Sequence, residues 1–88
     1  MAALDKPILF LETKGNSVVS KWNALDHQNV FQWILYVKYG ETWETEIFEK
    51  DIITKNIPLV KNGKKLNTIA VKSVDRLGNE SDYEAKKL

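Results

Sequence analysis

The sequence contains no cysteine, and it has one histidine and one arginine among its 88 residues. Without cysteine the chain has no disulfide, no thiolate zinc site and no cysteine nucleophile. His27 is the only histidine, and a metal site needs roughly three or four ligands, which the sequence does not supply around it. His27 follows Asp26, but no serine stands in a nucleophile-elbow context, so a catalytic triad is not predicted.

Long apolar segments are also absent. The longest apolar runs are far shorter than the roughly 18 residues of a transmembrane helix, so no membrane span is expected. The first residues, MAALDKP, lack the apolar h-region of a signal peptide. We interpret residues 1–6 as a linker or the start of an excised fragment, and residues 7–88 as one domain.

No excess of either charge is present. Thirteen lysines and arginines against twelve acidic residues give a net charge of +1, with lysine and glutamate interspersed. Arg76 is the only arginine, although arginine is the usual residue for bidentate contacts to phosphates and bases. The composition therefore argues against nucleic acid as a partner.

What the sequence does contain is alternation of apolar and polar residues with a period of two, as in FQWILYVKY and NTIAVKSV. This pattern is typical of half-buried strands, and Val, Ile, Thr, Trp and Tyr suit them. Turn signals such as Asn62-Gly63 and Gly78-Asn79 separate the runs. The spacing predicts an all-β, seven-stranded antiparallel β-sandwich, with strands at 8–12, 17–23, 30–39, 43–49, 56–60, 66–75 and 82–87.

Parity along each expected strand predicts the core. We expect the inward side chains to be Ile8, Phe10, Val18, Trp22, Trp33, Leu35, Val37, Ile57, Leu59, Ile69 and Val71.

The chain resembles the fibronectin type III domain, an immunoglobulin-like sandwich, from Pro7 to about Leu88. The resemblance rests on Pro7 before the first strand, Trp22 in VVSKWNA, the strand FQWILYVKY, Leu59, and the ending AVKSVDRLGNES. It implies that DRLGNES is the loop between the last two strands. Where the family has a tyrosine that bonds the preceding loop, this chain has Asn67, so the tyrosine corner is absent or replaced by a shorter side-chain bond.

The ending and the strand ILYVKYGE are also similar to the small C-terminal sandwich domains of bacterial glycoside-hydrolase-like proteins. This resemblance implies a non-catalytic accessory or interaction module of a larger exported, carbohydrate-active bacterial protein. Such a module is secreted, periplasmic or on the cell surface, and its partner is a neighbouring domain or another protein. The alternative is a carbohydrate-binding module whose partner is a polysaccharide.

Catalytic residues, metal ligands and a cofactor are not expected. Glu44 and Glu46 are a carboxylate pair, but we expect them on an outward strand face, without the cleft of a glycosidase. The lysines at positions 61, 64 and 65 are interpreted as solvated residues of a hairpin.

Two surfaces are candidates for contact. On the third strand and the penultimate strand, the outward residues Ile34, Tyr36, Lys38 and Ala70 form an expected domain-docking face. A weaker candidate is carbohydrate contact through Trp43, Tyr36 and Tyr39, because aromatic faces stack on sugar rings. That alternative requires at least two coplanar, exposed aromatic side chains.

Overall fold

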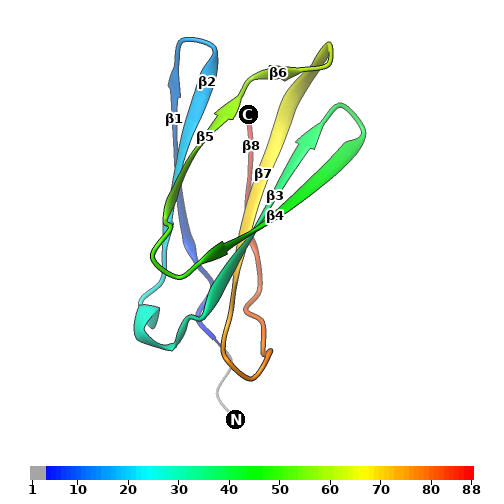
Figure 1. Ribbon diagram of the computed structural model, residues 1–88. Helices are drawn as coiled ribbons and strands as arrows, with labels where there is room; N and C mark the ends of the chain where they lie inside the picture. Colours follow the sequence, from blue (N-terminus) through cyan, green and yellow to red (C-terminus); the bar gives the residue numbers. More distant parts are fainter. Residues whose placement is uncertain (1–3) are drawn as a thin grey trace.

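A computed structural model describes residues 4–88 (Figure 1). In chain order its elements are β1 (Ile8–Lys14), β2 (Ser17–Asn23), the 3-10 helix η1 (His27–Asn29), β3 (Gln32–Tyr39), β4 (Thr42–Glu49), β5 (Thr54–Pro58), β6 (Val60–Lys61), β7 (Lys64–Val74) and β8 (Glu84–Lys87). Residues 1–3 of the expected linker lie outside the described part. No helix in that part is long and apolar enough to cross a membrane.

The strands form two antiparallel layers. One sheet has the order β1-β2-β5, and the other has the order β4-β3-β7, with β6 and β8 also paired to β7. Figure 1 shows β1 and β2 on one side and β3, β4 and β7 on the other. The predicted all-β antiparallel sandwich is therefore confirmed.

The strand count differs from the prediction at one place. The expected strand 56–60 is divided at Leu59 into β5, which pairs with β2, and β6, which pairs with β7 in the other sheet. At the crossing, the Leu59 N–H donates to the Asn16 carbonyl in one layer, and the Leu59 carbonyl accepts from Leu66 N–H in the other. The chain changes sheets directly after Pro58, whose nitrogen cannot donate to either ladder.

The core lies between the two sheets and agrees with most of the predicted set. Val18, Trp22, Trp33, Leu35, Ile57, Ile69 and Val71 are buried, while Val37 and Leu59 pack against them partly buried.

On β1 the predicted parity is wrong. Ile8 and Phe10 are 42% and 61% exposed, whereas Leu9 is buried and Leu11 packs against the core. The cause is the register with β2, in which Leu9 lies opposite the buried Trp22. Directly opposite residues of an antiparallel pair face the same side, so β1 turns Leu9 and Leu11 inward.

The two predicted turns have the backbone that their residues favour. Asn62 and Gly63 have φ values of +52° and +76° between β6 and β7, as a two-residue hairpin of type I′ requires. In DRLGNES the Asp75 carboxylate accepts from the backbone N–H groups of Leu77 and Asn79. The segment is therefore an ordered loop between β7 and β8, as predicted.

The molecule is elongated, with principal extents of 43 × 23 × 19 Å. Leu4, where the description begins, and Leu88 lie toward opposite ends of the long axis (Figure 1). Along one side the edges β1 and β8 come together, where Lys6 Nζ lies 3.7 Å from Glu84 Oε1. Along the other side, the edges β4 and β5 border an open cleft.

Candidate functional site

The cleft between β4 and β5 has a volume of about 420 Å³. Leu35, Val37 and Ile57 form part of its apolar lining. Four charged side chains border it and form two ion pairs, one from β4 to β6 of the same sheet and one from β4 to β5 of the opposite layer. Lys61 Nζ lies 2.7 Å from Glu44 Oε1, and Lys55 Nζ lies 3.7 Å from Glu46 Oε1.

The prediction that Glu44 and Glu46 face outward is wrong. They share the inner face of β4 with Phe48, which packs against the core and lies 5.6 Å from Trp22 between ring centroids. Inward charges on an edge strand discourage pairing with another chain. Because each carboxylate has its own lysine partner, the two lack the distinct environments of a glycosidase acid and nucleophile.

Tyr39 closes one end of this cleft. The residue is 3% exposed, and its hydroxyl donates to the Pro58 carbonyl oxygen at 2.6 Å, joining β3 of one sheet to β5 of the other. Burial raises the pKa of the Tyr39 hydroxyl; the nearby Lys61 ammonium opposes this effect, and Glu44 adds to it. The prediction that Tyr39 contacts carbohydrate is therefore wrong, because both its ring and its hydroxyl are used inside the sandwich.

Asn67 makes a different bond from the one expected of a tyrosine-corner replacement. Its Nδ2 donates to the Gly40 carbonyl at 2.8 Å, in the turn between β3 and β4. Its Oδ1 accepts from the Thr68 hydroxyl at 2.8 Å. Asn67 thus ties β7 to a hairpin of its own sheet, while the Tyr39 hydroxyl makes the side-chain bond to the segment that precedes β6.

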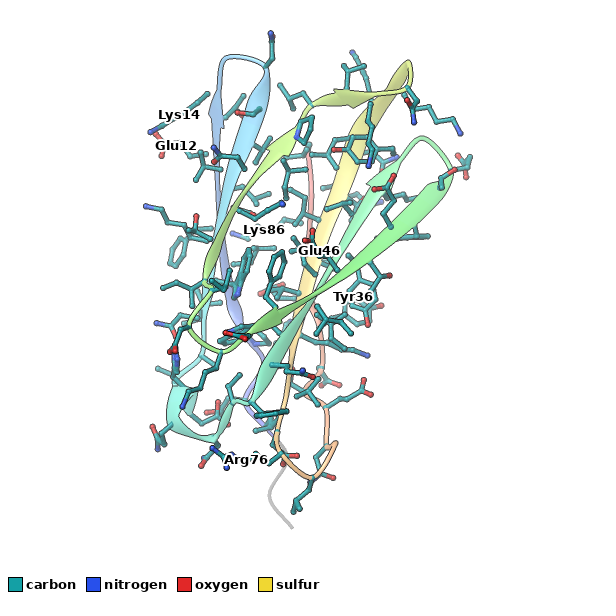
Figure 2. The ribbon with its side chains drawn as sticks, in the orientation of Figure 1. Glu12, Lys14, Tyr36, Glu46, Arg76 and Lys86 are labelled. Carbon is teal, nitrogen blue, oxygen red and sulfur yellow. The ribbon has the colours of Figure 1, made fainter. Side chains whose placement is uncertain are left out.

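The opposite side of the larger sheet is its outer face. Trp33, Leu35 and Tyr39 are buried, so Ile34, Tyr36 and Lys38 of β3 point away from the core. By the same alternation, Trp43, Thr45 and Ile47 of β4 lie on that side, opposite Lys38, Tyr36 and Ile34 respectively. Figure 2 shows Tyr36 on the side of this sheet away from β5, and Glu46 between the layers.

We call the set Ile34, Tyr36, Lys38, Trp43, Ile47, Ala70 and Lys72 the outer patch. Trp43 is 51% exposed and Ile47 is 59% exposed, while Ile34 and Tyr36 are half-buried beside them. Lysines lie over the aromatic rings, with Lys38 Nζ 5.6 Å from the Trp43 ring centroid and Lys72 Nζ 5.5 Å from that of Tyr36.

The outer patch contains the four residues of the predicted docking face. Tyr36 lies opposite Ala70, and Ala70 lies opposite Ala85 of β8. Ala70 is only 3% exposed, so the prediction that it offers contact surface is wrong, although it lies on the predicted face. Sequence reasoning does not single out Ile47, although its alternation with Trp43 is the signal that places it on this face.

Trp43 and Tyr36 meet one condition of the carbohydrate alternative. Both reach solvent on the same face, on neighbouring strands, in diagonal positions of the β3–β4 register. Trp22 and Trp33 are buried, so Trp43 is the one tryptophan that a ligand can reach.

The remaining candidates of the sequence do not assemble into a site. His27 Nδ1 lies 2.7 Å from Asn23 Oδ1, and Asp26 instead accepts from the Asp5 backbone N–H. Among residues 4–88, no group of three or more histidine or acidic side chains is placed to hold a metal ion.

Comparison with known proteins identifies a shared fold. No sequence family matches the chain, and no curated protein is significantly similar to it. Among solved structures, the chain is similar to part of pectate lyase PelI from Erwinia chrysanthemi, determined in complex with tetragalacturonic acid, with a TM-score of 0.67 and 17% sequence identity. The similarity covers 93% of this chain and 28% of that chain, so this fold is one part of a larger protein there.

Proposed function

We propose that this chain is a non-catalytic accessory module of fibronectin type III type in a larger exported bacterial protein that acts on carbohydrate. Its work is to pack against a neighbouring domain, or to space and orient it. The observation that carries the proposal is the outer patch. A free-standing sheet normally turns polar side chains to solvent, whereas here Trp43 and Ile47 are largely exposed beside Ile34 and Tyr36.

The strand order supports the fibronectin assignment. That assignment expects the third strand beside the penultimate strand, and β3 is paired with β7 along its whole length, from Gln32 to Tyr39. The described chain also runs from a point toward one end of the long axis to a point toward the other (Figure 1). This geometry suits a module that holds its neighbours apart.

The structural neighbour supports the carbohydrate-active context. Its name is that of a pectate lyase, and this fold accounts for 28% of its chain. The proposed exported location rests on the sequence resemblance alone.

The test compares the isolated chain with the protein that contains it. Trp43→Glu plus Ile47→Lys places charges in the outer patch, and Ile8→Lys plus Phe10→Glu does the same on the outer face of the other sheet. We expect the melting temperatures of both double variants of the isolated chain to lie within a few degrees of that of the unmodified chain, because all four side chains are well exposed.

In the whole protein, we expect only the Trp43→Glu plus Ile47→Lys variant to increase hydrogen exchange in the neighbouring domain. An equal effect of the two variants, or no effect of either, would refute packing through the outer patch.

Carbohydrate binding is the second candidate function. It is favoured by the exposed Trp43 side chain beside the half-buried Tyr36 on one sheet face, since aromatic rings accept sugar rings by stacking.

A further inference from the structure

The outer patch combines its aromatic rings with positive charge in a repeated arrangement. Lys38 and Trp43 lie opposite each other on β3 and β4, and Lys72 of β7 lies over the ring of Tyr36. Trp43 and Tyr36 are diagonal neighbours in the register, a placement that separates residues by roughly 7–8 Å. The patch therefore presents two aromatic–ammonium pairs side by side.

The charge of this surface is only partly neutralised. Lys72 is paired with Glu80, and this hydrogen bond is the main cause of its raised pKa. Lys38, by contrast, has no carboxylate within 4 Å in the part of the chain that the structure describes. Lys87 of β8 extends the row, because Thr68 lies opposite both Lys38 and Lys87. Within the outer patch, the most exposed aromatic side chain, Trp43, thus adjoins the ammonium group that has no carboxylate partner.

We propose that the outer patch binds an anionic polysaccharide, in which sugar rings that carry carboxylates repeat along the chain. One ring stacks on Trp43 with its carboxylate on Lys38, and a following ring reaches Tyr36 and Lys72. This inference rests on carbohydrate binding, the second candidate function, and it is the alternative to domain packing through the same surface. Protection of Trp43 in the whole protein favours packing, whereas an open Trp43 in the whole protein favours polysaccharide binding.

The same surface suits other polyanions less well. Single-stranded nucleic acid also stacks on aromatic rings in basic grooves, but those grooves follow the phosphate backbone with dense positive charge. Here Arg76 is the only arginine, and its guanidinium lies 5.8 Å from the Phe31 ring centroid, away from the outer patch in the 75–83 loop. An acidic peptide would use the lysines but would leave the exposed Trp43 ring without a flat partner.

The fluorescence of Trp43 reports ligand binding at the outer patch. Because Trp22 and Trp33 are buried, a ligand on the outer patch changes the emission and acrylamide quenching of Trp43 alone. The 88-residue chain is titrated with sodium polygalacturonate, with neutral galactan, with polyglutamate and with single-stranded DNA. Affinity electrophoresis in gels that contain each polymer gives a second measure, which also applies to variants without Trp43.

We expect polygalacturonate to bind, and added salt to weaken the binding, because salt screens the attraction between charges at a protein surface. Trp43→Ala and Lys38→Glu should each weaken it by about tenfold, the effect of losing one well-placed contact. Phe10→Ala and Lys21→Glu are the matched controls, since Phe10 lies opposite Lys21 on the outer face of the other sheet, and they should leave binding unchanged.

Three results would overturn the proposal. They are no binding of polygalacturonate, equal binding of polyglutamate or DNA, and equal loss of affinity in the control variants. Trp43→Tyr, which keeps a ring, should retain most of the binding, and its loss together with an unchanged melting temperature would also count against stacking.

Discussion

The bond between the Tyr39 hydroxyl and the Pro58 carbonyl links the two sheets. It is 2.6 Å long and is made by a side chain that is 3% exposed. Tyr39→Phe removes the donor and leaves the ring in place. An unsatisfied buried acceptor costs about 1–3 kcal/mol, and the lower part of this range applies here because Pro58 is an exposed residue. We therefore expect a loss of about 1–2 kcal/mol in the free energy of unfolding.

The measurement is urea unfolding of Tyr39→Phe beside Tyr83→Phe, because Tyr83 is 62% exposed and serves as the control. For a domain of this size the expected loss lowers the melting temperature by about 4–16 °C. The slope of the urea transition should stay constant, since the core is unchanged. If the two variants unfolded within about 0.3 kcal/mol of each other, the Tyr39 bond would not hold the sheets together.

The same residue predicts a dependence on alkaline pH. Burial raises the pKa of Tyr39 in the folded protein above its ordinary value of 10.0. Above pH 10 the unfolded chain loses this proton before the folded protein does, so the contribution of Tyr39 to stability falls as the pH rises through the folded pKa. The difference in stability between the wild-type chain and Tyr39→Phe should be full below pH 10 and should shrink above it. A difference that grew with pH would contradict the assigned direction of the shift.

Three further predictions follow from the fold. Trp22→Ala should lower the free energy of unfolding by about 3–5 kcal/mol in a denaturant titration, because the side chain is fully buried. A melting temperature within a few degrees of wild type would show that Trp22 is not a core residue. Asn67→Ala should cost about 1 kcal/mol by losing its bond to Gly40, and no change in unfolding would show that this bond is dispensable. The isolated chain should hydrolyse no glycoside, ester or peptide in a sensitive product assay, and turnover that disappears in Glu44→Gln or Glu46→Gln would overturn the non-catalytic assignment.

The sequence best predicts the inward face of a strand when the two faces of that strand differ in polarity. In β2 and β7 the alternation is regular, and the predicted inward residues Val18, Trp22, Ile69 and Val71 are buried. In β1 the run ILFL is apolar on both faces, so its period cannot show which face is inward. Its register with β2 decides this, and a register depends on residues that are distant in sequence.

The positions of Glu44 and Glu46 could not be predicted from polarity. Charged residues on a strand normally face solvent, and here solvent enters between the sheets because β4 and β5 are both edges. Lys55, the partner of Glu46, comes from β5 of the opposite layer, and Lys61, the partner of Glu44, comes from β6 at the far side of the same sheet, so no local pattern predicts either pair.

The outer patch was predictable in part. Alternation along β3 places Ile34, Tyr36 and Lys38 on one face, and the structure agrees. The addition of Trp43 and Ile47 depends on the pairing of β3 with β4. The low exposure of Ala70 depends on its neighbours on both sides, which only the three-dimensional arrangement brings together.

Hydroxyl-radical footprinting of Trp43 tests the central claim most directly, because it measures whether the outer patch is covered in the protein that contains this chain. The oxidation rate of the peptide with Trp43 is compared between the isolated chain and the whole protein, with Phe10 on the other sheet as the internal control. The proposed packing predicts strong protection of Trp43 in the whole protein and an unchanged rate at Phe10. Equal oxidation of Trp43 in both would contradict it, because the outer patch would then be open to solvent.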